Sequence, residues 1–203
     1  GRDQLTVDAS AFVWNSQYDS TYWRGTDATG TAVANISSGS SYEQIQQYLS
    51  TATTYTLVMY SLAAGGPWGY FGEVAALSIT NIEDLSITTS GVVDTGDLIF
   101  LHGIGDYDGK GGGDAIYADL SAAITSVVFD AASDQTYSYL GSNFTNFERF
   151  LIKTGSGNDS IDSSSVAMDD HLVLGAGNDT ALTGGGNDYV DAGSGDNTII
   201  AGN

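Results

Sequence analysis

A nine-residue period in the last quarter of the chain restricts the fold more than any other feature. A glycine-rich hexapeptide ends in a carboxylate at Asp179 and again nine residues later at Asp188. The units that fit this period are 154–162, 165–173, 174–182, 183–191 and 192–200. The second unit is in register only if Ser163 and Ser164 form a two-residue bulge. A fixed period of this kind predicts stacked, repeating supersecondary units.

Each unit divides into a turn and a very short strand. Its first six residues are polar and rich in glycine, which suits positive φ angles and close approach of neighbouring chains. Its last three alternate around an inward apolar residue, a pattern that predicts a strand. The expected inward residues are Ile161, Leu172, Val190 and Ile199, with Ala181 as a weaker case. Two units then make one coil of about 18 residues, with its strands stacked in parallel sheets.

Stacking brings the sixth-position side chains of alternate units together. Asp159 is expected above Asp179, Asp170 above Asp188, and Asp179 above Asn197. Stacked strands lie about 4.8 Å apart, and two carboxylates at that distance repel by about 3 kcal/mol at an effective dielectric constant near 20. A cation between them removes this repulsion. Calcium suits the position because it takes six to eight oxygen ligands, backbone carbonyls included.

The pattern Gly-Gly-x-Gly-x-Asp-x-apolar-x resembles the calcium-binding nonapeptide of the RTX (repeats-in-toxin) proteins. The resemblance implies a parallel β-roll, several bound calcium ions and secretion from a bacterium by a type I exporter. It also implies backbone ligands at early positions and a side-chain ligand at the sixth. Carried over, these are Gly155, Gly157 and Asp159; Gly175, Gly177 and Asp179; Gly184, Gly186 and Asp188; and Gly193, Gly195 and Asn197. Asn197 departs from Asp, so its site should be weaker. The alternative is a flexible loop rich in Gly and Asp by chance.

A longer repeat relates the two halves of the chain. Residues 3–11 resemble residues 114–122, and the Thr-Asn-x-Glu segment at 80–83 returns at 145–148. We therefore divide the chain into residues 1–122, a degenerate coil with an aromatic-rich insertion at about 12–78, and residues 123–203. The second part begins with a hairpin segment, continues as the roll at 154–203, and is continuous with the first.

The first half contains a degenerate version of the acidic turns. Asp97 and Asp114 stand 17 residues apart, close to one coil, and Gly111 to Gly113 precede the second of them. We predict a calcium site shared by Asp97 and Asp114, with Asp106 or Asp108 serving the opposite side. The alternative is a surface loop of solvated acids.

Between these repeats lie segments of variable length. In residues 123–143, VVFD and TYSYL predict a hairpin. In the insertion, Ser40 and Glu43 have capping-box spacing, so a short helix is expected over YEQIQQYL, and TYTLVMYSL predicts a buried strand.

The insertion is rich in large aromatic side chains, which could stack on a carbohydrate or anchor a peptide. The candidates for such a ligand-binding surface are Trp14, Tyr22, Trp23, Trp68 and Tyr70. The alternative, which we prefer, is that these rings fill the core of the insertion, because large aromatics dominate small cores.

Composition excludes several classes of protein. The chain carries 25 acidic against 5 basic residues, a formal charge of −20, so nucleic acid phosphates would be repelled. No stretch reaches the roughly 18 apolar residues of a membrane helix, so no membrane insertion is expected. Neither a zinc-binding HExxH helix nor a GxSxG elbow is present, and both histidines, His102 and His171, fall in predicted turns. No catalytic residue is predicted.

Together these features predict an all-β, right-handed parallel β-roll solenoid of nonapeptide repeats with an inserted aromatic-rich lobe. The expected function is a calcium-binding structural module that folds outside the cell. It would be part of a larger secreted or surface-attached bacterial adhesin or surface-layer protein, with adjoining repeats of the parent chain as partners. Two alternatives remain open: a carbohydrate- or peptide-binding module, and an accessory domain of a secreted hydrolase or toxin.

Overall fold

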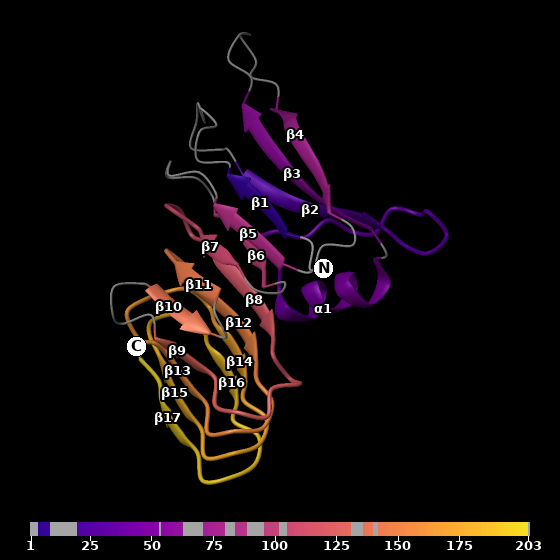
Figure 1. Ribbon diagram of the computed structural model, residues 1–203. Coiled ribbons are helices and arrows are strands. Elements are labelled where there is room, and N and C mark those ends of the chain that lie inside the picture. The colour runs from indigo at the N-terminus through magenta and orange to yellow at the C-terminus, as the bar shows by residue number, and fades with distance from the viewer. Residues whose placement is uncertain are drawn as a thin grey trace.

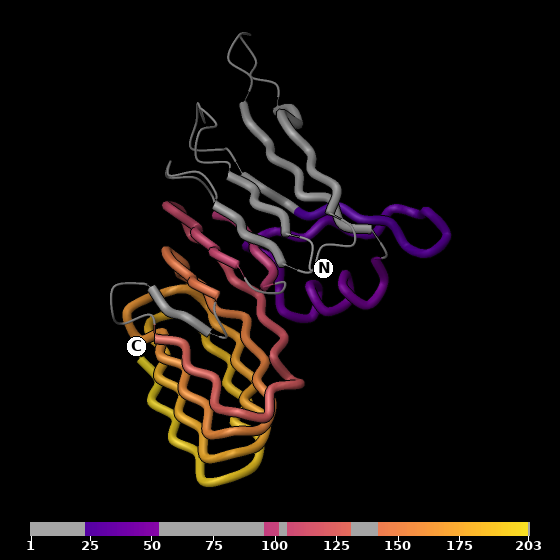
Figure 2. Tube along the Cα trace, in the orientation of Figure 1, coloured from indigo at the N-terminus to yellow at the C-terminus, as the bar shows by residue number. Residues whose placement is uncertain are grey.

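Parallel β-sheets dominate the structure of this chain, which is a computed structural model (Figure 1). The structure describes the backbone of residues 4–8, 20–52, 54–62, 71–79, 84–88, 96–101, 105–130, 136–139 and 142–202. Side chains are described for residues 23–52, 96–101, 105–130 and 142–202, and Figure 2 colours these parts of the chain. Within the described residues the fold is mostly strand with little helix, which is consistent with a parallel β-roll.

Two parallel sheets carry the repeats. The four-stranded parallel sheet contains β9 (Val128–Asp130), β13 (Ser160–Ser163), β15 (Thr180–Thr183) and β17 (Thr198–Ile200). The five-stranded parallel sheet contains β6 (Leu98–Phe100), β8 (Ala115–Asp119), β12 (Arg149–Lys153), β14 (His171–Val173) and β16 (Tyr189–Asp191). From β12 onward the chain alternates between the two sheets, so that alternate repeat units stack, as predicted (Figure 1).

The pairing registers confirm two extra residues between the first and second units, but the bulge was predicted too early, because Ser163 belongs to β13 and pairs with Thr183. Thr180 pairs with Thr198, and the corresponding backbone bond from Asp179 to Asn197 spans 18 residues. Ser160 pairs instead with Thr180, and the bond from Asp159 to Asp179 spans 20 residues. The two extra residues follow β13, where a turn begins at Ser164.

A further five-stranded sheet is mixed and combines strands from the N-terminal half with the hairpin that precedes β12. It contains β1 (Gln4–Asp8), β5 (Asp84–Thr88), β7 (Asp106–Asp108), β11 (Ser142–Thr145) and β10 (Thr136–Tyr139). Parallel pairing of β1 with β5 matches that of β8 with β12, since Gln4 pairs with Asp84 and Ala115 with Arg149. The longer repeat seen in the sequence is therefore also a repeat of strand pairing.

The predicted hairpin is placed wrongly. β9, which contains most of VVFD, pairs in parallel with β13, and Phe129 lies opposite Ile161. The antiparallel hairpin is formed instead by β10 and β11, so its second strand comes later in the chain than we expected. Burial explains the choice, because Phe129 and Ile161 are both almost fully buried.

The insertion contributes an antiparallel sheet and a helix. The sheet contains β2 (Ser20–Thr26), β3 (Thr54–Leu62) and β4 (Phe71–Ile79), and β3 confirms the strand predicted for TYTLVMYSL. Helix α1 (Tyr42–Thr51) is confirmed, but its N-cap is Ser41 rather than Ser40. The Ser41 hydroxyl accepts from the Gln44 backbone N–H, and the Gln44 side chain accepts from the Ser41 N–H. Both serines have a suitable residue three positions later, so spacing alone could not choose between them.

One hydrophobic core runs through the described residues. Ile161, Leu172 and Ala181 are fully buried in it, as expected, and Val190 is partly buried. Ile199 departs from the prediction, because its side chain is 43% exposed in β17, the edge strand of its sheet.

Candidate calcium site

The sixth residue of each repeat unit lies directly before a strand. Asp159 precedes β13, Asp179 precedes β15, and Asn197 precedes β17. The Asp159 backbone N–H donates to Asp179 Oδ1 at 2.8 Å, and the Asp179 N–H donates to Asn197 Oδ1 at 2.8 Å. These side chains therefore form a column in which each accepts a hydrogen bond from the backbone one coil earlier. We call it the Asp159 column.

A second column, the Asp170 column, lies at the start of the five-stranded parallel sheet. The Asp170 N–H donates to Asp188 Oδ1 at 3.0 Å, and Asp170 Oδ1 accepts from the Phe150 N–H at 2.8 Å. The expected stacking of Asp170 over Asp188 is therefore present, although the Asp170 turn contains no glycine.

Two carboxylate oxygens of the Asp159 column are buried without a hydrogen bond. Asp159 and Asp179 are 2% and 1% exposed, and the Oδ2 atom of each has no hydrogen-bond partner among the described residues. Burial raises the pKa of Asp179, with the nearby Asp159 charge adding to it, while the hydrogen bond from the Asp159 backbone lowers it. An unpaired buried carboxylate oxygen is costly. A cation held at these oxygens would remove that cost, so the residues present fit a calcium ion.

Glycine is required in these turns because successive turns nearly touch. A Cβ atom on Gly177 would lie 1.6 Å from the carbonyl oxygen of Gly157, and one on Gly193 would lie 1.8 Å from that of Gly175. Gly193 also has a φ of +65°, which L side chains rarely adopt. The other glycines predicted as backbone ligands also lie in turns between strands: Gly155, Gly175, Gly184, Gly186 and Gly195. Glycine is therefore needed for two reasons. It allows the backbone conformations that turn carbonyl oxygens inward, and it leaves room for the neighbouring turn.

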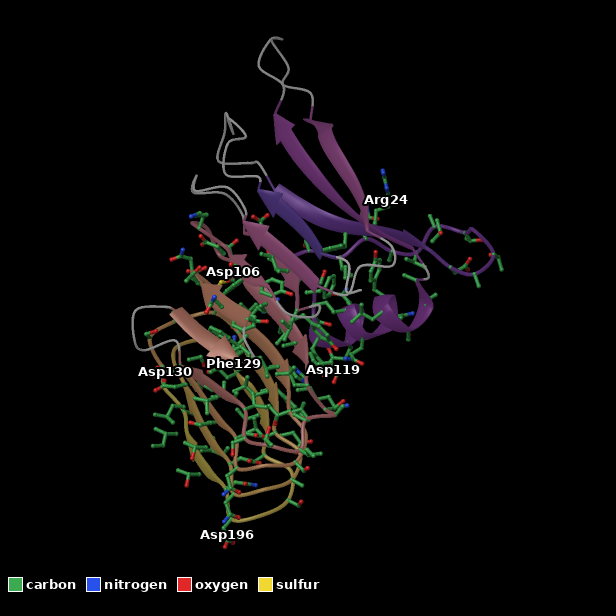
Figure 3. All side chains as sticks on the ribbon, in the orientation of Figure 1. Arg24, Asp106, Asp119, Phe129, Asp130 and Asp196 are labelled. Atoms are coloured by element: carbon green, nitrogen blue, oxygen red, sulfur yellow. The ribbon has the colours of Figure 1, made fainter. Side chains whose placement is uncertain are left out.

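The residue before each sixth position forms a ladder of its own, which the sequence analysis missed. The Asn178 N–H donates to Asn158 Oδ1 at 2.9 Å, and the Asp196 N–H donates to Asn178 Oδ1 at 3.0 Å. On the other side the Asn187 N–H donates to Asp169 Oδ1 at 2.7 Å. Figure 3 shows Asp196 at the outer end of the stacked turns. The repeated Asn or Asp in the fifth position was a signal for this ladder.

Asp97 and Asp114 are also brought together. The Asp97 N–H donates to Asp114 Oδ1 at 2.7 Å, and both residues are almost fully buried directly before β6 and β8. They therefore repeat the geometry of the C-terminal columns and are not a solvated surface loop.

Glu148 continues this acidic stack and was not predicted as a site residue. Its Oε2 atom accepts from the Asp114 backbone N–H at 2.9 Å, and burial raises its pKa. Glu148 ends the second Thr-Asn-x-Glu segment and stands directly before β12, as Asp114 stands before β8. The position of a carboxylate at the start of a predicted strand was the available signal.

Asp106 and Asp108 have other partners. Asp106 Oδ1 accepts from the Asn143 side-chain amide at 2.6 Å. Asp108 forms an ion pair with Lys110 at 2.6 Å and accepts from the Asn146 side-chain amide at 2.7 Å. Protein donors already satisfy these carboxylates, so the structure gives no support to a calcium role for either.

Asp170 differs from Asp159 and Asp179 in its second oxygen. Asp170 Oδ2 accepts from the Ser163 hydroxyl at 2.6 Å. Burial raises the pKa of Asp170 to about 7, against the opposing effects of hydrogen bonds from Ser163 and Phe150. The two columns thus present different chemistry to a cation.

No group of three or more His, Asp or Glu side chains able to hold a metal ion occurs among the described residues. The columns instead offer carboxylates in pairs, together with the carbonyl-rich turns beside them. Calcium accepts backbone carbonyls as ligands, so a site of this kind does not need three acidic side chains.

Trp23 is not part of a ligand-binding surface and follows the preferred interpretation, in which the aromatic rings fill the core. Its side chain is only 3% exposed, its Nε1 donates to the Leu98 carbonyl oxygen at 2.6 Å, and its ring lies 4.9 Å from that of Phe100. Trp23 therefore fills the core. Trp14, Trp68 and Tyr70 lie outside the described residues, as does the side chain of Tyr22 in β2.

His171 is not a solvated turn residue. It begins β14, and its ring stacks between those of Tyr42 at 3.9 Å and Tyr189 at 4.3 Å. Burial lowers the pKa of His171, so the neutral ring is favoured. His102 lies outside the described residues.

Comparison with known proteins assigns the C-terminal turns. A family model described as the RTX calcium-binding nonapeptide repeat (4 copies) matches residues 166–199. Residues 166–199 are RTX calcium-binding repeats. The RTX match includes both sixth-position residues of the Asp170 column, and it includes Asp179 and Asn197 of the other column. Asp159 precedes the matched RTX segment but has the same geometry.

No curated protein and no solved structure matches the chain. Among the described residues, no helix is long and apolar enough to span a membrane.

Proposed function

We propose that this chain is a calcium-dependent structural module that folds into a right-handed parallel β-roll when calcium binds. The observation that carries the proposal is the pair of buried, unpartnered Oδ2 atoms on Asp159 and Asp179, one coil apart within stacked glycine turns. Calcium-binding RTX repeats occupy residues 166–199, which supports calcium as the ion.

Charge makes folding depend on the ion. The chain has a formal charge of −20, and its columns place carboxylates in successive coils about 4.8 Å apart. Each such pair costs about 3 kcal/mol at an effective dielectric constant near 20. Calcium supplies positive charge at these oxygens when it is bound. Asp159, Asp179, Asp170 and Asp188 are the side chains that would hold it, with turn carbonyls completing the ligand set.

The cellular setting follows from calcium supply. RTX repeats are typical of secreted bacterial proteins, and sites in extracellular modules bind calcium with dissociation constants of about 0.1–1 mM. We propose that the chain is part of a larger secreted or surface-attached protein of the adhesin or surface-layer kind. Calcium at ten times the dissociation constant of one site stabilises the fold by about 1.4 kcal/mol.

A structural role is favoured over the alternatives. The burial of Trp23 removes the central candidate for carbohydrate or peptide stacking in the insertion. The sequence offers no recognised catalytic motif, so we propose a scaffold and not an enzyme.

The direct test compares Asp179→Asn with Asp162→Asn during a calcium titration followed by circular dichroism. Both changes remove one negative charge, but Asp162 lies in the middle of β13 and accepts only from neighbouring Ser164. Asn at 179 can still accept from the Asp159 N–H, so the calcium-free protein should lose no stability. We expect a cooperative gain of β signal in the parent, and a calcium midpoint raised at least about five-fold by Asp179→Asn.

Asp162→Asn should leave the midpoint within about two-fold of the parent. Magnesium should replace calcium poorly, because it demands octahedral geometry and retains its water. The proposal would be contradicted if the parent chain gave the same circular dichroism in chelator and in calcium at ten times the Kd, about 10 mM for the weakest sites of this class.

A further inference from the structure

The Ser165–Asp170 turn differs from the other repeat turns because it contains no glycine. Protein contacts hold it instead. The Ser163 hydroxyl donates to Asp170 Oδ2 at 2.6 Å, the Phe150 N–H donates to Asp170 Oδ1 at 2.8 Å, and Val166 is buried at 7% exposure. Both oxygens of Asp170 are therefore engaged by the chain itself.

Arg149 links this turn to the insertion. Its Nε donates to the Asp169 carbonyl oxygen at 2.8 Å, while its Nη1 donates to the Ser40 carbonyl oxygen at 2.9 Å and also to that of Ser38. One guanidinium thus ties together three backbone carbonyls from two distant segments. The guanidinium also places positive charge beside Asp169 and Asp170. In the other RTX turns, a bound calcium ion would have to supply that charge.

Helix α1 packs against the same region. Tyr42 stacks on His171, the residue directly after Asp170, with ring centroids 3.9 Å apart. Gln46 donates to the Tyr117 hydroxyl of β8, and Ile45 of the helix is fully buried in the common core. Figure 1 shows α1 beside β8 of the five-stranded parallel sheet. The contacts that hold it there are made by protein side chains alone.

The Asp159 column has the same backbone donors at Oδ1, from Val127 to Asp159 and from Asp159 to Asp179, but in the part of the chain that the structure describes it lacks a donor at Oδ2. Asp159 Oδ2 and Asp179 Oδ2 are buried without a hydrogen-bond partner among the described residues. Removal of calcium would leave these two oxygens buried without a donor, whereas Asp170 Oδ2 would keep the Ser163 hydroxyl. The two columns should therefore differ in how much they need the ion.

We propose that Arg149, helix α1 and the Ser165–Asp170 turn form a nucleus that stays folded without calcium, and that calcium orders the Asp159 column upon it. This rests on the proposed function, and it makes Arg149 a positioning residue for the Asp170 turn. Calcium-dependent folding would then spread from one side of the repeats to the other.

Amide hydrogen exchange on the whole chain, with and without chelator, tests the nucleus directly. In chelator, the amides of Ile45 and Phe150 should stay protected, while those of Asp159 and Asp179 should exchange at least about 100-fold faster than with calcium. Equal loss of protection at all four amides in chelator would overturn the nucleus. If no amide responds to calcium, the proposed function fails instead, so the two failures are distinguishable.

A variant pair identifies the part played by Arg149. Arg149→Gln and Lys153→Gln each remove one positive charge from β12. Within the described part of the chain, Arg149 bonds to the Asp170 turn and Lys153 does not. In chelator, Arg149→Gln should speed exchange at Phe150 and Ile45 by about ten-fold or more, and Arg149→Lys should restore part of the protection. Lys153→Gln should change neither amide. Equal effects of the two glutamine variants would show that Arg149 acts only through net charge and would overturn its positioning role.

Discussion

The repeats at 154–202 and the insertion segment at 20–52 reach a buried core by different means. The repeats bury aliphatic side chains, such as Ile161, Leu174 and Ala181, and most of their turns rely on close backbone stacking at glycine. The insertion instead buries large rings, with Trp23 and Tyr48 each 3% exposed. The repeats should therefore be sensitive to backbone and charge, and the insertion to side-chain volume.

The largest expected effect comes from adding a methyl group to the repeats. In Gly177→Ala the new Cβ would lie 1.6 Å from the Gly157 carbonyl oxygen, at a φ of +146°. Neighbouring coils cannot separate without breaking their ladder, so the calcium-loaded protein should lose more than about 4 kcal/mol. Urea unfolding at saturating calcium measures the loss. Gly39→Ala is the control, because its Cβ would meet nothing within 4 Å and should cost under about 1 kcal/mol.

Deleting the Trp23 ring tests the other side of the comparison. Trp23→Ala should cost about 3–5 kcal/mol, because it removes a buried ring and the bond to the Leu98 carbonyl. If side-chain volume governs the insertion, urea unfolding should show a similar loss with and without calcium, and Trp23→Phe should recover part of it. A loss confined to calcium-loaded protein would mean that the insertion depends on the ion as the repeats do.

The pH dependence of the calcium-free protein should report on the buried Asp170 carboxyl. The folded-state pKa of Asp170 is raised to about 7 from an ordinary value of 3.8, so the folded chain holds a proton that the unfolded chain releases. Its contribution to the free energy of unfolding is therefore present at about pH 4 and is lost as the pH rises towards 7. The slope cannot exceed about 1.4 kcal/mol per pH unit for one group.

Asp179 and Glu148 also have raised pKa values and add to this slope, whereas the lowered pKa of His171 opposes it. Asp170→Asn should flatten the profile of the calcium-free protein in chelator. Should the variant keep the full parental slope, Asp170 is not the group responsible.

The smallest expected effect comes from restoring the repeat at Asn197. Its Nδ2 donates to the Ala192 carbonyl oxygen at 2.7 Å, so Asn197→Asp places an oxygen against an oxygen when calcium is absent. We expect about 1 kcal/mol of destabilisation in chelator and a calcium midpoint lowered about three-fold. Asn187→Asp adds the same charge at an exposed fifth position. It should change neither the stability in chelator nor the calcium midpoint. Thermal unfolding in chelator and in calcium distinguishes these outcomes.

The sequence was sufficient to predict the parts of the fold that its period controls. Stacking of Asp159 over Asp179 follows from counting residues. The two extra residues before Asp170 could be counted in the same way, but not placed, because Ser163 continues β13 and pairs with Thr183. Glu148 was missed because it belongs to no nonapeptide, although it takes the same place before a strand.

Outside the period, local patterns left choices that only tertiary contacts decide. VVFD has the alternation of a hairpin strand, but Phe129 is buried opposite Ile161 in a parallel sheet. Trp23 and His171 could not be assigned to core or surface from composition, because their environments come from Leu98 and Tyr42, far away in the chain.

The column of hydrogen bonds from Asp159 to Asp179 to Asn197 has a direction. In each step the backbone belongs to the earlier coil and the side chain to the later one. In this column each coil supplies the acceptor for the backbone of the coil before it, so loss of one aspartate should first affect the preceding coil. A coil can therefore be added to or removed from such an array without other changes. Each added coil brings one side-chain oxygen, which accepts from the free backbone N–H at the end of the preceding coil.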